Sequence, residues 1–300
     1  MSSACILCPI DFSDPSRAAL GYADALAEHF GARLILLSVD DPLLAEAAGA
    51  GLAVPLLDDT LQELHRFSSS AIGSVSGAAQ VARCVRTGKP AVEILREARA
   101  SGSDLIVMSS RGQTGIRTRF FGSTTERVLR ETPIPVLITP ALQPPGQTLD
   151  DIASHIRRIV APVDLTVASE RQVTISSGIA TALGVPLLVA HVVEPITISQ
   201  RVRQQVTGAD ALRRSQAEHA LETLVRKAGK SAKIETMVLT GDPAEEIAKT
   251  AEARRANLIV MGLHSSAMTG PRMGSVTYRV LSLTRRLVLA LPPAPTPKPS

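Results

Sequence analysis

Short apolar runs alternate with amphipathic stretches along the first half of the chain. Five runs have the length of buried strands and are too short for helices, and they lie at residues 4–10, 33–39, 81–86, 104–108 and 135–139. Helical periodicity separates them: Ala18, Tyr22, Leu26 and Phe30 share one face of a helix that Asp14 caps, that begins at Pro15 and that Gly31 ends. Further helices are expected at 57–72, 91–100 and 123–130. This alternation predicts a doubly wound α/β domain around a parallel sheet.

The second half of the chain repeats the landmarks of the first half. Asp11 matches Asp164, Gly31 matches Gly184, Gly88 matches Gly241 and the run 104–108 matches 257–261, each at an interval of 153 residues. A constant interval over these landmarks indicates an internal duplication. Beyond the fourth strand Gly122 matches Gly274 at an interval of 152, so the second loop is one residue shorter than the first.

Proline and glycine mark the boundaries between the repeats. Residues 141–156 contain Pro144, Pro145 and Gly146 and show no periodicity, which predicts a linker. The residues from Pro292 onward are rich in proline and predict an unpacked tail. We therefore expect one domain at 1–140, a linker at 141–156, a second domain at 157–291 and a tail at 292–300.

A glycine-bearing loop follows the fourth strand and leads into a helix. Its spacing is Ser109-x2-Gly112-x9-Gly122-Ser123. A strand that delivers such a loop onto a helix N-terminus makes an anion site, because the backbone amides point outward and the helix dipole favours negative charge. The alternative is that Ser123 and Glu126 form a capping box, in which case Gly122 and Ser123 only start a helix.

Composition argues against nucleic acid and membrane as partners. The formal net charge is +4, but the basic residues are dispersed, aromatic residues make up 2% and tryptophan is absent. The apolar runs are far shorter than a membrane span, and no basic segment of a signal peptide precedes the first strand. We therefore expect a cytoplasmic protein that binds neither nucleic acid nor membrane.

The cysteines indicate packing rather than redox chemistry. Cys5 and Cys8 have the spacing of a redox or metal motif, but both lie on an expected strand, where residues three apart point to opposite faces. A structural zinc site needs about four ligands. We expect buried thiols.

Both halves resemble domains of the universal stress protein family. The phosphate loop of that family has the pattern G-x2-G-x9-G-[ST], and the first half has it with Ser109 in place of the first glycine. The second half has Gly262-x2-Ser265-x8-Gly274-Ser275-Val276-Thr277, which keeps the first glycine and loses the second. The resemblance implies two tandem Rossmann-like domains, each a five-stranded parallel sheet of order 3-2-1-4-5 with helices on both faces. It also implies that the halves pair as an intramolecular pseudo-dimer.

The resemblance further implies a site for ATP in each half, with Mg²⁺ held by the phosphates. Asp11 would hold the base end, and the backbone at Val39 would lie along adenine. The phosphate-binding positions of the first half are Ser109, Gly112, Gly122, Ser123 and Thr124, with added charge from Arg111, Arg117 and Arg119. The matched positions of the second half are Asp164, Gly262, Gly274, Ser275 and Val276. The alternatives are a turn or cap for Asp11 and Asp164 and a solvated loop for the arginines.

The function that these expectations favour is a nucleotide-binding regulator of the stress response rather than an enzyme. No His–carboxylate pair lies within either motif to activate water. The histidines are expected at the surface or in packing, at His29, His65, His155, His191 and His219. The alternatives are a weak ATPase or autophosphorylating enzyme and a nucleotide-free scaffold. Partners would be an adenine nucleotide, an unknown protein and possible copies of the chain itself. The first site is expected to be the stronger, because it keeps Gly112 and the full loop length.

Overall fold

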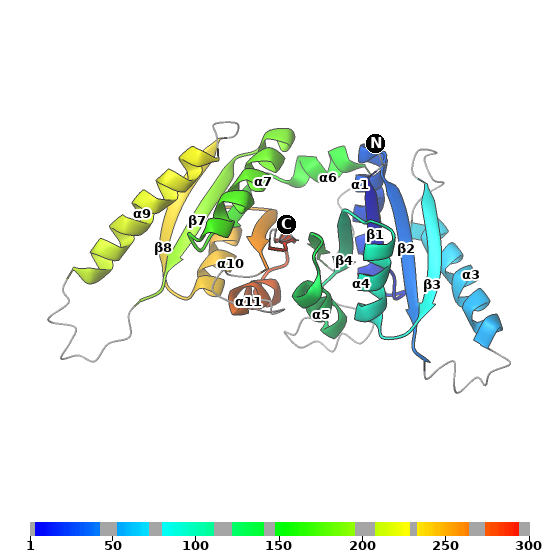
Figure 1. Ribbon diagram of the computed structural model, residues 1–300. Helices are drawn as coiled ribbons and strands as arrows, with labels where there is room; N and C mark the ends of the chain where they lie inside the picture. The colour runs from blue at the N-terminus through cyan, green and yellow to red at the C-terminus, as the bar shows by residue number, and fades with distance from the viewer. Residues whose placement is uncertain are drawn as a thin grey trace, which may run out of the picture. The chain divides into compact units, whose positions relative to one another are not determined.

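The chain forms two compact units, Met1–His155 and Ile156–Ser300. The computed structural model describes residues 4–42, 53–71, 80–110, 122–140, 148–195, 208–228, 233–263 and 274–293. Each unit is a layered α/β structure, and Figure 1 shows helices on both sides of each set of strands.

Unit 1 has a parallel sheet of order β3-β2-β1-β4-β5. Its elements are β1 Cys5–Pro9, α1 Asp14–Phe30, β2 Arg33–Asp40, α3 Ala53–Ala71, β3 Val81–Thr87, α4 Pro90–Ala100, β4 Leu105–Ser109, α5 Ser123–Glu131, β5 Val136–Thr139 and α6 Leu149–His155. α1 and α3 pack together on one face of the sheet, and α4 and α5 pack together on the other. This is the arrangement that right-handed crossovers produce.

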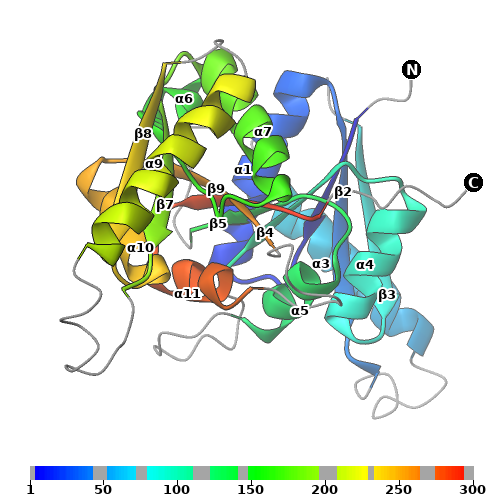
Figure 2. The same ribbon diagram turned by 60° about the vertical axis from the view of Figure 1, so that its left-hand side comes forward.

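Unit 2 repeats this architecture, with the order β8-β7-β6-β9-β10. Its elements are β6 Ile159–Pro162, α7 Val167–Leu183, β7 Leu187–Val193, α9 Ala209–Lys227, β8 Ile234–Thr240, α10 Pro243–Ala253, β9 Leu258–Gly262, α11 Ser275–Leu283 and β10 Leu287–Leu291. α7 packs with α9, and α10 packs with α11 (Figures 1 and 2). The predicted doubly wound α/β class is confirmed.

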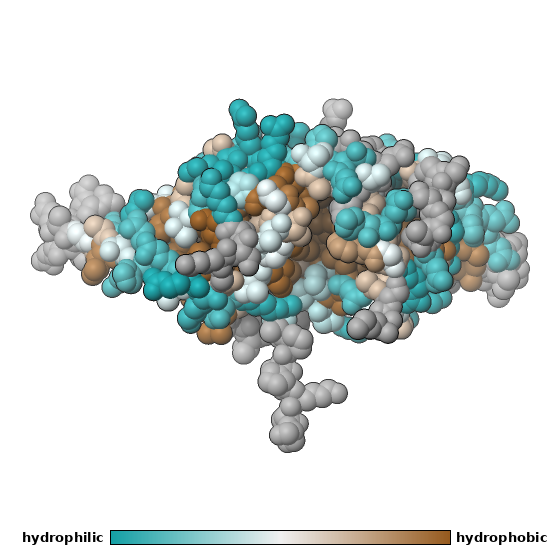
Figure 3. All heavy atoms as spheres, turned by 90° about the horizontal axis from the view of Figure 1, so that it is seen from above, coloured by the Kyte–Doolittle hydropathy of each residue, from teal (hydrophilic) through white to brown (hydrophobic). Residues whose placement is uncertain are grey.

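The central strands are apolar on both faces because helices cover both. Leu7, Leu34 and Ile106 of unit 1 and Ile159 and Leu188 of unit 2 are fully buried. Outside the core, Figure 3 shows hydrophilic residues spread over both units with smaller hydrophobic patches among them. No helix in the described ranges is both long and apolar enough to cross a membrane.

Cys5 and Cys8 are buried thiols, as expected. Cys5 and Cys8 are buried in β1, and burial raises the pKa of the Cys8 thiol far above its usual range. Among the described residues, no group of three potential metal ligands exists. A redox or zinc role for this pair therefore has no support in the structure.

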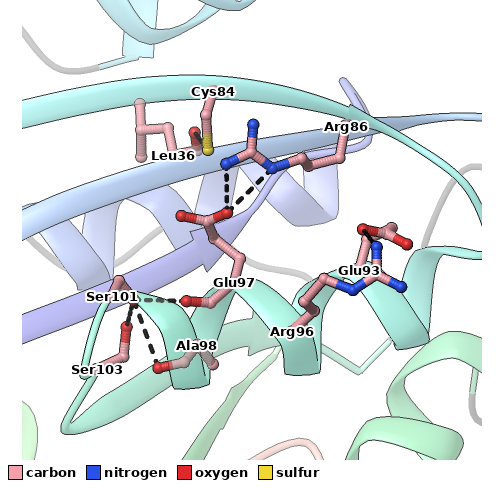
Figure 4. A network of polar contacts seen from close by, with 9 residues as sticks. All are labelled: Leu36, Cys84, Arg86, Glu93, Arg96, Glu97, Ala98, Ser101 and Ser103. Atoms are coloured by element: carbon pink, nitrogen blue, oxygen red, sulfur yellow. Dashed lines mark hydrogen bonds and ion pairs between the residues drawn. The ribbon is translucent and has the colours of Figure 1, made fainter.

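A glycine turn connects β3 to α4. Gly88 has a φ of 154°, and its amide donates to the Asp40 carbonyl at 3.0 Å. The buried Glu93 carboxylate lies under this turn and pairs with Arg96 at 2.8 Å. Arg86 of β3 pairs with Glu97 of α4 at 2.8 Å, and this ion pair ties the strand to the helix (Figure 4).

The structure corrects three predicted boundaries. The N-cap of α1 is Ser13, whose hydroxyl accepts from the Ser16 amide, so the helix starts after Ser13 and not at an Asp14 cap. The predicted linker at 141–156 includes the helix α6, which packs against α1. The first residue of the predicted tail, Pro292, is held by the unit, since its carbonyl accepts a hydrogen bond from Arg171 at 2.7 Å.

The helix α6 was missed because its own start signal is short. Thr148 and Asp151 form a reciprocal cap: the Asp151 amide donates to the Thr148 hydroxyl at 3.2 Å, and the Thr148 amide donates to the Asp151 carboxylate at 3.1 Å. The preceding proline and glycine residues dominated the pattern and led to the linker prediction.

Candidate functional site

A crevice forms in unit 2 where β6 and β9 part. The two strands pair only at Ile159 with Leu258 and at Val160 with Ile259, and beyond that point no ladder joins them. The Gln172 amide bridges the gap by donating to the Pro162 carbonyl at 2.7 Å and to the Val260 carbonyl at 2.9 Å. This is the topological switch point, at the carboxyl edge where doubly wound sheets bind ligands.

A cavity of about 630 Å³ lies at this edge. It gathers the five positions predicted for the second half, and these are Asp164, Gly262, Gly274, Ser275 and Val276. Thr277, Arg171, Gln172, His191 and Glu194 also line it. Residues more than a hundred apart in the sequence therefore converge on one space.

Asp164 is held by a turn at the end of β6. Its Oδ1 atom accepts from the Thr166 amide at 3.0 Å, from the Thr166 hydroxyl at 2.6 Å and from the Ser169 hydroxyl at 2.9 Å. Leu165 sits in the left-handed region with φ of 60°, a conformation that branched side chains rarely adopt. Among the described residues no group donates to Oδ2 of Asp164, so the turn orients the carboxylate and leaves this oxygen to the cavity.

Unit 1 builds the same turn at the end of β1. Oδ1 of Asp11 accepts from the Ser13 amide at 3.1 Å and from the Ser13 hydroxyl, and Phe12 has the φ of 60° found at Leu165. The turn considered for Asp11 from the sequence is therefore present. Because an unusual backbone conformation recurs at matched positions, the surrounding structure of each unit must impose it.

The start of α11 presents unused amides to the cavity. The Gly274 amide donates to the Leu263 carbonyl at 2.9 Å, and the Thr277 hydroxyl donates to the Gly262 carbonyl at 2.9 Å. The helical ladder begins with the Tyr278 amide on the Gly274 carbonyl at 3.2 Å. The amides of Ser275, Val276 and Thr277 thus have no acceptor among the described residues, and a helix dipole lies behind them.

The start of α5 in unit 1 has the same bonds. The Gly122 amide donates to the Ser110 carbonyl at 3.0 Å, and the Thr125 hydroxyl donates to the Ser109 carbonyl at 3.1 Å. The capping box considered as an alternative does not form. Gly122 is the N-cap without a side-chain cap, and the Glu126 carboxylate pairs with Arg130 instead. Nothing in the described chain caps the Ser123 and Thr124 amides, so these N–H groups remain without an acceptor there.

The backbone conformation of Gly274 does not require a glycine. Its φ of −59° and ψ of 142° suit any residue, and an added Cβ would meet the Leu263 carbonyl at 3.7 Å, an ordinary contact. A side chain would therefore fit the protein at this position, which directly precedes the free amides. The absence of a side chain makes sense where a ligand approaches the backbone closely.

The remaining predicted positions belong to unit 1. Ser109 is the buried last residue of β4, and Val39 is half-buried near the end of β2. Arg111, Gly112, Arg117 and Arg119 fall outside the described residues. The prediction that Gly112 strengthens the first site thus stays a prediction.

The cavity residues that were not predicted include Arg171, Gln172 and His191. His191 had been expected at the surface or in packing. Its Nδ1 atom lies 2.8 Å from the Val163 carbonyl, which can only accept, so Nδ1 carries a proton and Nε2 is the remaining ring nitrogen. The signal for these residues was in the repeat, because the positions 153 residues earlier hold Ala18, Ala19 and Ser38.

Comparisons with known proteins agree with this architecture. The family model described as the universal stress protein family matches residues 5–140 and 155–292. A universal stress protein of Thermus aquaticus is 31% identical over 133 residues, which are 44% of this chain and 96% of that protein.

Some solved structures match the whole chain, and others match about half of it. A universal stress protein from Archaeoglobus fulgidus covers 97% of this chain and 99% of its own, with a TM-score of 0.69 and 19% identity. A universal stress protein solved in complex with cAMP covers 47% of this chain and 100% of its own, with a TM-score of 0.36 and 25% identity. Since the family model matches nearly the full length of both units, the chain belongs to the universal stress protein family as a tandem two-domain member.

Proposed function

We propose that the chain binds adenine nucleotides and acts as a regulator in the stress response without efficient catalysis. The observation that carries this proposal is the cavity of unit 2, which joins the free amides at the start of α11 to the oriented carboxylate of Asp164. The amides and the helix dipole suit phosphate oxygens. Oδ2 of Asp164 suits a donor such as a ribose hydroxyl or an amino group.

The remainder of the cavity suits a flat base. Val192, Ile247, Met261 and Leu291 line it together with Pro292, so most of its wall is apolar. Pockets for small molecules commonly combine such walls with a few convergent polar groups. Mg²⁺ would be held by the phosphates of ATP, where it would screen their negative charge.

The placement of possible bases argues against efficient hydrolysis. Asp164, His191 and Glu194 are the lining groups that can accept a proton, and they follow or belong to β6 and β7. The amides that would hold phosphates follow β9 at the start of α11. A general base must lie within hydrogen-bond reach of the attacking water, so we propose binding with turnover well below about one per second.

The test uses the full chain and two matched glycine substitutions. Gly122→Ala and Gly274→Ala each place a methyl group beside the free amides of one unit. Gly178→Ala is the control, because Gly178 lies on an exposed part of α7 and an added Cβ there meets nothing within 4 Å. Titration calorimetry with AMP, cAMP and ATP measures binding, and thermal unfolding measures the fold.

We expect the wild-type chain and Gly178→Ala to bind at least one of these nucleotides equally well. The variant that carries both Gly122→Ala and Gly274→Ala should bind at least about tenfold more weakly, because a charge-assisted amide–phosphate bond contributes roughly 1.5–3 kcal/mol. Unchanged melting would show that the fold is kept. The proposal fails if the wild-type chain binds none of them, or if the double variant binds as the wild type does. Turnover of ATP at ordinary enzyme rates would instead support the ATPase alternative.

A further inference from the structure

Arg171 brings a cation to the cavity of unit 2 at a position where unit 1 has alanine. It lies on α7 and lines the cavity, whereas the matched residue of unit 1 is Ala18. One guanidinium nitrogen, Nη1, donates to the Pro292 carbonyl at 2.7 Å. A guanidinium has five N–H donors, so the others remain for a ligand.

Arg171 differs from the arginines that serve the fold of unit 2. Arg158 pairs with Glu235 at 2.8 Å, and Arg279 pairs with Asp242. Arg171 is half-buried and pairs with no carboxylate in the described part of the chain. A cation in such a position retains its full charge for an anion, and its planar fork matches the oxygens of a phosphate.

The cation and the free amides face the same cavity from different layers. Arg171 comes from α7, on one side of the sheet, and the amides of Ser275, Val276 and Thr277 come from α11, on the other. Both belong to the carboxyl edge of the sheet. Together they can hold one phosphate group from two sides.

The helix α10, which begins at the cavity, is acidic at its start. Pro243 and Ile247 line the cavity, Asp242 is the N-cap of the helix, and Glu245 lies in its first turn. The Asp242 carboxylate accepts from the Glu245 amide at 3.1 Å and takes up the charge of Arg279. The Arg279 hydrogen bond holds the pKa of Asp242 below its usual range, so this carboxylate is ionised at neutral pH.

The positions of unit 1 that match Asp242 and Glu245 carry no negative charge. Lys89 matches Asp242 and Val92 matches Glu245 at the interval of 153. The formal charge of the pair is therefore +1 in unit 1 and −2 in unit 2, where Arg279 pairs with both carboxylates and Lys249 lies 3.5 Å from Glu245, so that part of the negative charge is offset. The second and third phosphates of a nucleotide would therefore be attracted by Lys89 in unit 1 and repelled by Asp242 and Glu245 in unit 2.

We infer that the cavity of unit 2 selects a nucleotide with a single phosphate, which Arg171 and the first turn of α11 bind while Asp242 and Glu245 disfavour a longer phosphate chain. This inference rests on the proposed function and assigns a ligand class to one of the two sites. AMP and cAMP share the required chemistry, and ATP does not.

The experiment uses the full chain with Gly122→Ala, which weakens the site of unit 1. Titrations with AMP, cAMP and ATP without added magnesium give three dissociation constants. Arg171→Gln removes the charge and keeps an amide that can donate to the Pro292 carbonyl. The control is Arg214→Gln, because Arg214 lies on α9 and pairs with Glu218 away from the cavity. Asp242→Asn with Glu245→Gln removes the acidic border and keeps a good N-cap.

We expect AMP or cAMP to bind at least about tenfold more tightly than ATP. Arg171→Gln should weaken the tighter ligand about tenfold, and Arg214→Gln should not change it. Neutralising Asp242 and Glu245 should strengthen ATP binding several-fold and leave AMP binding within about twofold. These sizes follow from charge-assisted hydrogen bonds and close charge pairs at partly exposed positions.

Two results would overturn the inference. ATP might equal or exceed AMP and cAMP in affinity, in which case unit 2 has no preference for one phosphate and the proposed function stands. Arg171→Gln might bind as the control does, in which case Arg171 only fixes Pro292. If the wild-type chain also binds none of the three ligands, the proposed function itself fails. Thermal unfolding of each variant confirms that lost affinity is not lost folding.

Discussion

Replacing Gly88 by alanine should destabilise unit 1 through two separate effects. The φ of 154° at Gly88 is a conformation that residues with a Cβ avoid. A Cβ there would also stand 2.8 Å from Oε1 and 3.0 Å from Cγ of Glu93. Glu93 cannot simply move into solvent, because it is 5% exposed and paired with Arg96 (Figure 4). Gly88→Ala therefore combines backbone strain with overpacking.

The two effects have estimable sizes. A residue forced into a sparsely populated backbone region costs about 1–3 kcal/mol. Overpacking at a buried site costs about 1–3 kcal/mol, and here Glu93 can relieve part of it by shifting. We expect a loss of about 2–4 kcal/mol in the free energy of unfolding of unit 1. For a domain of this size each kcal/mol lowers the melting temperature by about 2–4 °C.

Two other glycines of the chain separate the effects. Gly102 has a φ of 63° and open space around its Cβ position, so Gly102→Ala measures strain without a clash. Gly178 has neither problem, and Gly178→Ala should raise helix stability by about 0.5–1 kcal/mol. Urea unfolding and calorimetry of the full chain measure all three variants.

The contact with Glu93 is tested by a double-mutant cycle. Gly88→Ala should cost less in a Glu93→Ala background, with a coupling of about 1–2 kcal/mol between the two sites. The reasoning is wrong if Gly88→Ala costs no more than Gly102→Ala or if the cycle shows no coupling. Gly241→Ala repeats the test in unit 2, where the Cβ would stand 2.9 Å from Cγ of Glu246.

Two titratable groups give further expected outcomes. Burial and the neighbouring Glu28 raise the pKa of Asp24 to about 6, so wild-type stability falls as the pH rises from about 4 to 6. Asp24→Asn should therefore raise the free energy of unfolding at pH 8 by on the order of 1–3 kcal/mol and leave it unchanged near pH 3, as measured by urea unfolding. Burial and Glu97 raise the pKa of Cys84 to about 11, so iodoacetamide should modify native Cys84 far more slowly at pH 7.5 than the unfolded chain. Equal rates in the two states would contradict this.

Local patterns were sufficient to predict the α/β class, whereas the strand order came from the family resemblance. The buried strands read as continuous apolar runs because helices cover both faces of each sheet, and Gly31 and Gly184 end their helices in the left-handed conformation. The helix α6 escaped notice because a seven-residue helix has too few turns to show periodicity. Its reciprocal cap between Thr148 and Asp151 was the available signal.

The site was only partly predictable, for a physical reason. Asp164, Gly274 and Ser275 lie at strand ends and helix starts, where the sequence itself marks the turn. Arg171 and His191 lie inside a helix and a strand, where no local motif marks them. They reach the cavity because the parallel strands end at one edge, and that convergence is a property of the tertiary fold.

The fusion of two units in one chain gives this protein a freedom that identical subunits lack. In an assembly of identical single-unit chains, any substitution appears in every copy of the site. Here the position matched by Ala18 in one unit holds Arg171 in the other, and the position of Lys89 holds Asp242. One copy can drift toward a new ligand while the other keeps the old one, and translation of one chain fixes their ratio. Covalent linkage therefore lets two copies of one architecture differ at matched positions while they remain in a fixed ratio of one to one.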